Sequence, residues 1–567
     1  MFRPTSAQLS MLESQFLLPP VKRKRLEESW AEDFRTRVLP LIDESAFKDD
    51  FCDDNGRPNR SIRLLVGLHI LKEMFDLTDS EVLDNLEFNL QWQHALSVTV
   101  DEAHLCQKTL HNFRVRLAKS GRATRLFNQV VVAMVDQEKI AINRQRLDST
   151  HVRSNIATLT RLSLFVETIT SFLREVRKRA PAKLEPIHPA FVAQYLDRDG
   201  YFSDVKRDEA RRRLPLVAQH VADVVGYFKD DAEITTWPEF GTLARLLREQ
   251  CEPAKPETPS DASVPMPDGD PPGPPTEGGP PLPGAPPVVP KAPTDISGSS
   301  LQSPHDPDAT YGHKGKGYSA QLAETCSAEN PFQLVTFFLL TGANRSDQHA
   351  VREVIQDLNE KSMKPATIFA DAGYGSGANI LEALDAGVDL HAPVRDPSNL
   401  PKVSGLVPMT MRGAPSDEAP ATDGLLATEV AGAPDGGTPP PSSGSADPEK
   451  LEDMASKNEN AAIGFADEAA PQAPQTKKDA RAAATKERQR VQRTPAFKDA
   501  YKIRSGIEST NAELKGRHGG AGFRVRGQRR MEVALALKLL ALNTSRLVDH
   551  HRHRRREAAR GPAGARR

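Results

Sequence analysis

Two proline-rich stretches interrupt the chain and limit how it can fold. Residues 251–300 hold 16 of the 45 prolines, residues 401–450 hold a further 9, and neither stretch contains Phe, Trp or Tyr. Such segments bury too little apolar surface to offset the entropy lost on ordering them. The 567 residues therefore do not form one compact domain. We expect globular parts interrupted by two disordered segments.

Outside these stretches, the spacing of apolar residues predicts an α/β protein. Apolar side chains recur at helical spacing from Ile62 to Phe75, and Thr78 with Glu81 has the capping-box pattern that begins another helix. Short apolar runs that end at turn residues, such as Thr367–Ala370, instead predict strands. The order of these elements predicts a mixed sheet flanked by helices, preceded by an all-helical domain.

The same pattern divides the chain into consecutive parts. We expect an N-terminal helical, DNA-binding domain (1–135), the first strand of the sheet (136–154), a helical insertion (155–250), a disordered Pro-rich linker (251–304), the second part of the sheet domain (305–397), an acidic low-complexity linker with a charged helix (398–497), two C-terminal helices (498–549) and a basic tail (550–567).

The distribution of charge indicates a polyanionic partner, although the formal net charge of the chain is −1. Residues 501–548 carry 10 basic and 3 acidic side chains, whereas residues 401–470 carry 4 basic and 12 acidic ones. A locally basic surface of this kind is typical of proteins that bind nucleic acid. The alternative for the Arg-rich C-terminal tail is a solvated charged segment.

A second basic feature lies in the N-terminal helical domain. The predicted helix near Gln107–Leu117 carries Lys108, Arg114 and Arg116 away from its apolar face. Three short helices with a basic last one resemble a helix-turn-helix module, which places one helix in the major groove of DNA. A helical packing domain without DNA contacts accounts for the same residues equally well.

The residue pattern richest in chemistry lies between Tyr501 and Lys515. On an α-helix, Tyr501, Arg504, Glu508 and Lys515 fall within an arc of about 60°. One face then presents a carboxylate beside two cations and a phenol, which suits a carboxylate that holds a metal while its neighbours bind phosphates. The alternative is a solvated helix face with an Arg–Glu pair at positions i and i+4.

This Y-x2-R-x3-E-x6-K pattern resembles the signature around the catalytic Glu of bacterial insertion-sequence DDE transposases. The resemblance implies a ribonuclease-H-like catalytic domain in which Asp148, within Leu147–Thr150, and Asp371, within Ala370–Tyr374, complete the triad with Glu508. The segments 311–318 and 340–347 also look like family segments beside the second and third strands. The long separation of Asp148 from Asp371, filled by the helical insertion, departs from the family pattern.

The resemblance also implies an activity, a cofactor and roles for basic residues. The chain is expected to be a DNA transposase that binds terminal inverted repeats, cleaves strands and transfers them. Two Mg2+ ions, with Mn2+ as a substitute, are expected on Asp148, Asp371 and Glu508, because hard cations prefer carboxylate oxygens and two ions stabilise phosphodiester cleavage. DNA contacts are expected from Tyr501, Arg504, Lys515, Arg517, Arg524, Arg526, Lys108, Arg114 and Arg116.

The expected partners are double-stranded DNA and a second copy of the chain, paired on DNA, in the cytoplasm at the nucleoid. The four cysteines are far apart, so no zinc or disulfide framework is expected. The apolar runs are shorter than the ~20 residues that cross a bilayer, so no membrane association is expected. Two other functions remain open. One is a catalytically silent DNA-binding repressor or domesticated transposase. The other is a metal-dependent phosphohydrolase that acts on small esters.

Overall fold

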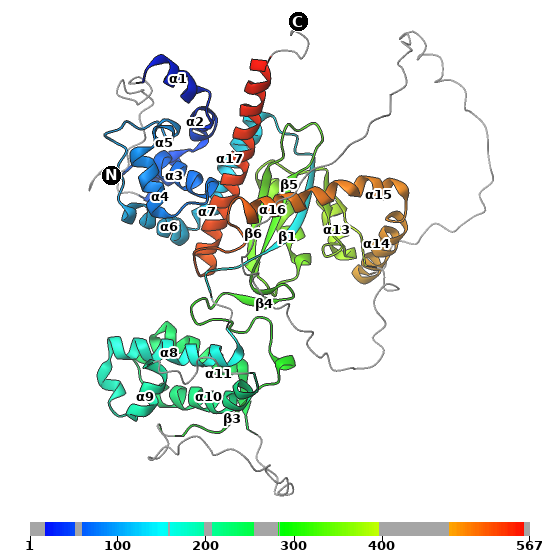
Figure 1. Ribbon diagram of the computed structural model, residues 1–567. Coiled ribbons are helices and arrows are strands. Elements are labelled where there is room, and N and C mark those ends of the chain that lie inside the picture. Colours follow the sequence, from blue (N-terminus) through cyan, green and yellow to red (C-terminus); the bar gives the residue numbers. More distant parts are fainter. Residues whose placement is uncertain are drawn as a thin grey trace, which may run out of the picture. The chain divides into compact units, whose positions relative to one another are not determined.

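The computed structural model describes residues 18–50, 59–156, 159–197, 207–254, 282, 284–395 and 476–560 (Figure 1). These residues belong to one compact unit, whereas a second unit, Asp396–Gln475, falls outside them. Most of both segments predicted to be disordered also lies outside the described residues, so their disorder stays a prediction. In the described ranges, no helix combines the length and hydropathy needed to cross a membrane.

Helices form the N-terminal part of the unit, as the sequence predicts. They are α1 (Pro20–Glu27), α2 (Trp30–Asp33), α3 (Ile62–Met74), α4 (Asp79–Phe88), α5 (Leu90–Ala95), α6 (Gln107–Ser120) and α7 (Arg122–Glu138). The capping box that begins α4 is confirmed. The Thr78 hydroxyl accepts from the backbone N–H of Glu81, and the Glu81 carboxylate accepts from that of Thr78.

A mixed sheet follows, which confirms the predicted fold class. Its strands are β1 (Arg144–Val152), β4 (Thr310–Gly312), β5 (Gly315–Thr325), β6 (Val335–Gly342), β7 (Thr367–Ala370) and β8 (Asp389–His391). The order across the sheet is β6-β5-β1-β7-β8, and β4 pairs with the start of β5. Strand β5 runs antiparallel to β1 and β6, whereas β7 is parallel to β1 and β8 is parallel to β7.

The parallel half of this sheet requires crossover helices, because parallel neighbours cannot be joined by a tight turn. Helix α12 (Ala350–Glu360) precedes β7, and α13 (Gly377–Asp385) lies between β7 and β8. Strand β1 has neighbours on both sides and most of its residues are buried, as expected for a central strand covered on both faces. The centre of β1 is therefore a rigid position for a side chain.

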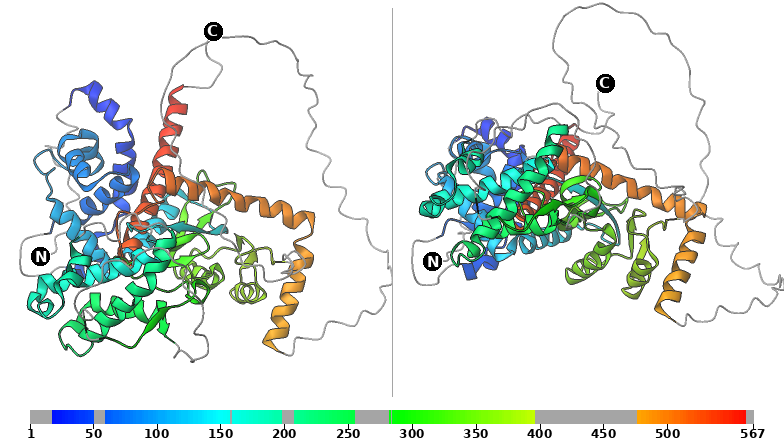
Figure 2. Two further views of the ribbon diagram at one scale, coloured as in Figure 1. Left: turned by 60° about the horizontal axis from the view of Figure 1, so that its bottom comes forward. Right: turned by 90° about the horizontal axis from the view of Figure 1, so that it is seen from below.

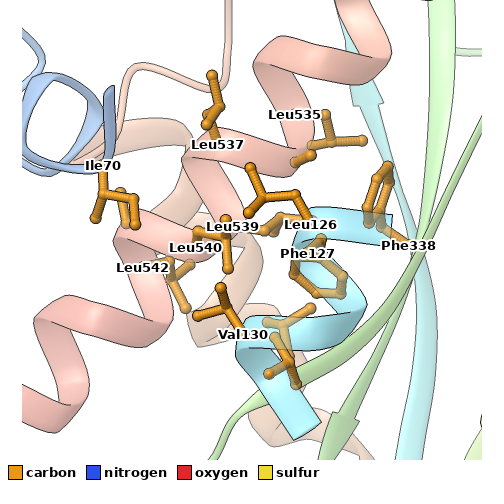
Figure 3. Close-up of a cluster of buried hydrophobic side chains, with 14 of the residues drawn as sticks. Ile70, Leu126, Phe127, Val130, Phe338, Leu535, Leu537, Leu539, Leu540 and Leu542 are labelled. Carbon is orange, nitrogen blue, oxygen red and sulfur yellow. The ribbon is translucent and has the colours of Figure 1, made fainter. Parts of the chain in front are cut away.

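Helix α17 (Gln528–Arg560) joins the N-terminal helices to the sheet. Figure 3 shows leucines of α17, such as Leu540, between Ile70 of α3 and Phe127 of α7. The ring of Phe127 in turn meets the ring of Phe338 in β6 edge-on, with centroids 5.0 Å apart. The buried side chains of the N-terminal helices, α17 and the sheet form one continuous hydrophobic core.

The predicted helical insertion has a hydrophobic core of its own. It consists of α8 (Arg161–Arg179), α9 (Pro189–Leu196), α10 (Arg207–Phe228) and α11 (Pro238–Gln250). The interval 251–304, predicted as a disordered linker, differs at both ends. Strand β2 (Cys251–Pro253) pairs antiparallel with β3 (Val288–Pro290), and Leu301 is buried in the insertion core. Proline is compatible with this short two-stranded ladder because both strands are edges.

The C-terminal helices differ from the prediction in two details. A 3-10 turn (Lys502–Ser505) separates α15 (Pro495–Tyr501) from α16 (Gly506–Gly516), where one helix was predicted. Figure 2 shows α15 and α16 following one another nearly in line, with α14 (Lys477–Val491) at an angle to them. The predicted basic tail begins as helix, because α17 continues to Arg560.

That extension of α17 has specific partners. Arg555 forms an ion pair with Asp33 of α2, whose side chain is almost fully buried. His551 contacts the carboxylate of Glu138 at 2.8 Å. These contacts anchor the Arg-rich end of the helix on the N-terminal helices.

A buried carboxylate ties the C-terminal helices to the sheet. Glu324 of β5 is fully buried and accepts from Arg146 of β1 at 2.6 Å and from Thr510 of α16 at 2.5 Å. Arg546 of α17 donates to the same carboxylate and to Thr510. We call these four residues the Glu324 cluster. A buried charge is tolerated only when it is paired and hydrogen-bonded, so this cluster specifies where α16 and α17 meet the sheet.

We predict that Glu324→Ala lowers the free energy of unfolding by about 3–5 kcal/mol, because half-buried Arg146 loses its counter-charge and Arg546 keeps only Glu513. Urea denaturation measures the difference. The matched control is Asp499→Ala, which breaks the exposed Asp499–Lys502 pair and should leave the unfolding midpoint unchanged. A Glu324→Ala chain as stable as the wild type would contradict this account of the cluster.

Candidate active site

Two of the three predicted catalytic carboxylates lie side by side at the centre of the sheet. Asp148 lies in β1, and Asp371 directly follows β7. These strands pair in parallel with Leu147 opposite Ala370, so the next residue of each chain segment is one of the two aspartates. Asp371 therefore emerges where its strand ends, at the edge of the sheet where ligands commonly bind in α/β proteins, and Asp148 lies beside it within β1. The short apolar run of β7 has the bounds that the sequence predicts.

The third carboxylate, Glu508, comes from the first turn of α16. Helix α16 is held over β1 by Thr510, which belongs to the Glu324 cluster, and by Asn511. The amide nitrogen of Asn511 donates to Oδ2 of Asp148 at 3.0 Å. Asn511 therefore orients the first aspartate directly. The Glu508 side chain itself is 66% exposed, so it faces the side from which a substrate can approach.

Arg504 lies within ion-pair distance of all three carboxylates. Its Nη2 lies 3.0 Å from Oδ1 of Asp148 and 3.9 Å from Oδ2 of Asp371, and its Nη1 lies 3.1 Å from Oε1 of Glu508. The pairing with Glu508 is the i,i+4 contact that the sequence suggests. The other two contacts join residues far apart in the chain. Arg504 was predicted to bind DNA phosphates, and that role stays a prediction beside the contacts found here.

The donor set around Arg504 suits a hard divalent cation, which prefers carboxylate oxygens. In the described part of the chain, no group of three or more His, Cys, Asp or Glu side chains already surrounds a metal-sized point. The guanidinium stands between the three carboxylates. Oδ1 of Asn511 is buried beside Asp148 without a hydrogen-bond partner among the described residues, which leaves one further oxygen unsatisfied at the site. These residues fit a metal site in their chemistry.

Glycines allow the loop after Asp371 to fold tightly. A Cβ on Gly375 would lie 1.9 Å from the backbone oxygen of Pro393, and one on Gly377 would lie 2.1 Å from that of Arg481 in α14. Both distances are too short for any residue that has a Cβ. Glycine is needed at these positions because other backbone atoms approach closely, and not because the backbone is left-handed. Oδ1 of Asp371 accepts from the backbone N–H of Gly373 at 2.7 Å, which fixes the carboxylate.

A fourth carboxylate, Asp347, supports the same region and was not predicted as a site residue. It accepts from Ser149, the neighbour of Asp148, at 2.9 Å and from Gln321 of β5 at 2.6 Å. The hydroxyl of Tyr374, which is fully buried, donates to Gln321. The sequence signal was its place at the end of the family-like segment 340–347. This network connects the strand that carries Asp148 to the turn that follows Asp371.

Tyr501 lies at the end of an aromatic stack next to the triad. The rings of His391 and Phe497 are stacked with centroids 3.8 Å apart, and the ring of Tyr501 lies parallel to Phe497 at 6.0 Å. Burial raises the pKa of the Tyr501 hydroxyl. A neutral ring held in this way can stack on a base or donate a hydrogen bond to a phosphate.

Two lysines, Lys314 and Lys515, lie near Asp148. Burial lowers the pKa of Lys515, and the neighbouring charge of Lys314 lowers it further. Burial also lowers the pKa of His151, and Lys515 adds to that effect. Two ammonium groups close together without an ion-pair partner among the described residues favour a bound anion.

The other predicted DNA-binding residues fall into two groups. Lys108 and Arg116 are exposed on α6. Among the others, Arg114 pairs with Asp79, Arg517 pairs with Asp549 at 2.9 Å, Arg524 donates to the backbone oxygen of Leu77, and Arg526 donates to that of Asn155. Their predicted contacts with DNA stay predictions.

Three of these residues share one basic cleft of ≈470 Å³. Arg114, Arg524 and Arg526 line it together with Lys72 and Arg530, neither of which was predicted. Glu73 and Asp79 are the acidic residues in the lining, so basic side chains are in excess. The cleft brings α6 of the N-terminal region next to the loop that follows α16. Sequence reasoning could not find it, because its walls are more than 400 residues apart.

Two family models match this chain. One, described as "Transposase domain (DUF772)", matches residues 24–116, and the other, "Transposase DDE domain", matches residues 292–544. The second match contains Asp371 and Glu508. The chain belongs to the DDE transposase family. Asp148 lies ahead of the match to the DDE domain, and it is the structure that places this residue beside the other two members of the predicted triad.

This chain is also similar to a curated protein, over a shorter stretch. The chain is 29% identical over 127 residues to "Uncharacterized protein ORF8 in nfe locus" of Rhizobium meliloti, an alignment that covers 22% of this chain. The chain spans 61% of the length of that relative. No solved structure matches the chain.

The burial of Asp148 leads to a prediction about pH. Burial raises the pKa of this carboxyl more than Arg504 lowers it. The stability that the protonated form provides is therefore complete below the ordinary pKa of Asp and is lost as pH rises through the raised value. Asp148→Asn has no charge to bury, so it should become more stable than the wild type as pH rises through this window.

Urea denaturation of both proteins between acidic and neutral pH measures this difference. Asp499→Asn, at an exposed position whose pKa is lowered by a hydrogen bond from Lys502, is the control and should show no such gain. An Asp148→Asn variant that loses stability relative to the wild type as pH rises would show that Arg504 outweighs burial at this site.

Proposed function

We propose that this chain is a DNA transposase that binds the inverted repeats of its element, hydrolyses a DNA strand and joins the freed 3′ end to target DNA. The observation that carries the proposal is the approach of Asp148, Asp371 and Glu508, from three distant chain segments, to within 4 Å of one guanidinium group. Three acidic groups held near one another are unfavourable unless a cation balances them, so their approach to one guanidinium indicates a site made for cations.

Asp148, Asp371 and Glu508 would hold Mg2+, for which Mn2+ can substitute. A pair of such ions lowers the pKa of the attacking water and stabilises the leaving oxygen in phosphodiester cleavage. The protein supplies the geometry. Strands β1 and β7 fix the two aspartates, Asn511 orients Asp148, and α16 presents Glu508 from the exposed side. Lys515 and Lys314 lie next to Asp148, where they can bind a phosphate oxygen of the strand that is cut.

The basic cleft supports binding of the DNA duplex beyond the scissile phosphate. Exposed Lys108 and Arg116 on α6 provide a second basic surface on the N-terminal region. Basic groups on two separate elements allow one DNA end to contact both the N-terminal helices and the catalytic domain. Transfer of both element ends requires that they be held together, so we expect a homodimer on DNA at the nucleoid.

A catalytically silent DNA-binding protein is the alternative that the same surfaces would permit. The complete triad, with Asn511 and the Asp347 network oriented around it, favours the enzyme. A phosphohydrolase acting on small esters would need the carboxylates but not the basic cleft. DNA cleavage and ester hydrolysis by the same preparation therefore separate all three functions.

We predict that Asp148→Asn, Asp371→Asn and Glu508→Gln each reduce Mg2+-dependent cleavage of DNA by about 10³-fold or more, because each removes a metal-binding charge. The substrate is a duplex that carries the repeats bracketing the reading frame. Nicked and joined products are measured by denaturing gel electrophoresis. DNA affinity, measured by gel shift, should remain within a few-fold of the wild type.

The matched control is Asp499→Asn, which removes an exposed acidic group two residues before Tyr501 and should cleave like the wild type. Cleavage that persists in all three variants would refute the triad. Binding without cleavage by the wild type, in Mg2+ and in Mn2+, would favour the silent DNA-binding protein instead.

We further predict that Arg530→Gln weakens DNA binding across all sequences and lowers the slope of log K against log salt by about 1, as expected for loss of one phosphate contact. Arg530 lines the basic cleft, and no ion pair of this residue occurs among the described residues. Fluorescence anisotropy over a range of salt concentrations measures the slope. Arg352→Gln on α12, where the arginine is exposed outside the cleft, is the control. Equal slopes for the two variants would exclude the cleft as a DNA site.

A further inference from the structure

We propose that Arg504 is an internal counter-cation that occupies the carboxylate site before metal binds, and that a phosphate of the DNA draws it away to open the site. This inference rests on the proposed function, because it assigns the order in which the same site takes DNA and metal. It gives Arg504 a positioning role in the free protein that is separate from its predicted contact with DNA.

The geometry places the guanidinium on the oxygens that a metal would need. Nη2 lies between Oδ1 of Asp148 and Oδ2 of Asp371, and Nη1 lies against Oε1 of Glu508, all within 3.9 Å. Among the described residues, Arg504 is the cation within ion-pair distance of all three. A divalent ion bound to these oxygens would therefore be next to a fixed positive charge, so Arg504 and the ion compete for one place.

The resting position of Arg504 is not fully satisfied. Its Nε–H is buried and has no hydrogen-bond partner among the described residues, although both Nη atoms are engaged. A buried donor without a partner costs free energy, and this cost is removed if the group finds an acceptor. A phosphate offers several oxygens that a guanidinium can bind through two parallel hydrogen bonds, including one from Nε. DNA therefore offers Arg504 a better partner set than the carboxylates do.

Two consequences follow from this competition. Without DNA the site should bind metal weakly, because the ion must displace Arg504. With DNA the guanidinium is engaged elsewhere, and metal affinity should rise. Linkage requires the converse as well, so bound metal should raise the affinity for DNA by the same factor. Such coupling would limit metal loading, and hence strand cleavage, to the DNA complex.

The test measures Mn2+ binding to the full chain by the electron paramagnetic resonance signal of free Mn2+, at mildly alkaline pH and without DNA. We expect Arg504→Gln to bind Mn2+ about tenfold more tightly than the wild type, because a repelling charge has been removed from the site. Arg504→Lys, which keeps the charge but cannot form the two-nitrogen contact, should fall between them. Urea denaturation verifies that each variant is folded.

The matched control is Lys502→Gln, which removes a charge of the same sign from the same 3-10 turn. Lys502 pairs with exposed Asp499 at 2.9 Å, away from the triad, so this variant should bind Mn2+ like the wild type. Adding Asp148→Asn to Arg504→Gln should abolish the gain, which locates it at the triad. Adding a duplex with the terminal repeat should raise the Mn2+ affinity of the wild type and not that of Arg504→Gln.

The outcomes separate this inference from the function on which it rests. If Arg504→Gln binds Mn2+ no more tightly than the wild type while binding in both requires Asp148, the counter-cation role is refuted and the metal site stands. If no binding that requires Asp148 is found in any variant, with or without DNA, the proposed function fails and the inference fails with it.

Discussion

The buried carboxylate of Glu324 is the interaction on which the arrangement of the catalytic domain depends. It lies in β5, yet its partners come from β1, α16 and α17, so one charge connects two strands with both C-terminal helices. A carboxylate without solvent must be paired, and the observed placement of both helices pairs it. The same arginine of β1 also donates to the backbone oxygen of Ile503, at the start of the segment that carries Arg504 and Glu508.

The geometry of the candidate site is thus built from two layers of charge with different surroundings. The inner layer is the fully buried carboxylate of Glu324 with two half-buried arginines, of which Arg546 also pairs with Glu513. The outer layer, around Arg504, is acidic and partly open to solvent. Rigidity of the first allows the second to hold an excess of like charges, because the backbone that carries them cannot relax apart. Asp347 and Tyr374 extend this support to the turn after β7.

The sequence predicted those structural features that depend on residues close together in the chain. The apolar run of β7 between Pro365 and Asp371 gave a strand with correct bounds, and the spacing of Arg504 and Glu508 gave their mutual contact. Those features depend on neighbours within one turn or one strand. The break between α15 and α16 was missed because it involves a contact with a distant strand. The guanidinium of Arg146 in β1 lies where a Cβ of Gly506 would be.

Contacts between distant segments account for what the sequence could not show. Glu324 looks like an ordinary acidic residue in a strand, and nothing local distinguishes it from an exposed one, since its partners are 178 to 222 residues away. Asp347 and the basic cleft are similar cases. The link from Arg504 to Asp148 spans 356 residues, and it changes the interpretation of that arginine from a surface cation to a member of the carboxylate site.

The antiparallel pairing of β1 with β5 has a consequence for the insertion between them. In topological terms the two strands are the arms of a β-hairpin, and the whole helical insertion is its loop. Lys316, at the return of the chain, donates to the backbone oxygen of Leu159 at its departure, so the loop begins and ends at nearly the same place. The entropy of closing a loop grows only with the logarithm of its length, by about 0.6 kcal/mol for each doubling. An insertion with its own core can therefore be lengthened, shortened or exchanged without shifting the hairpin register that holds Asp148 in place.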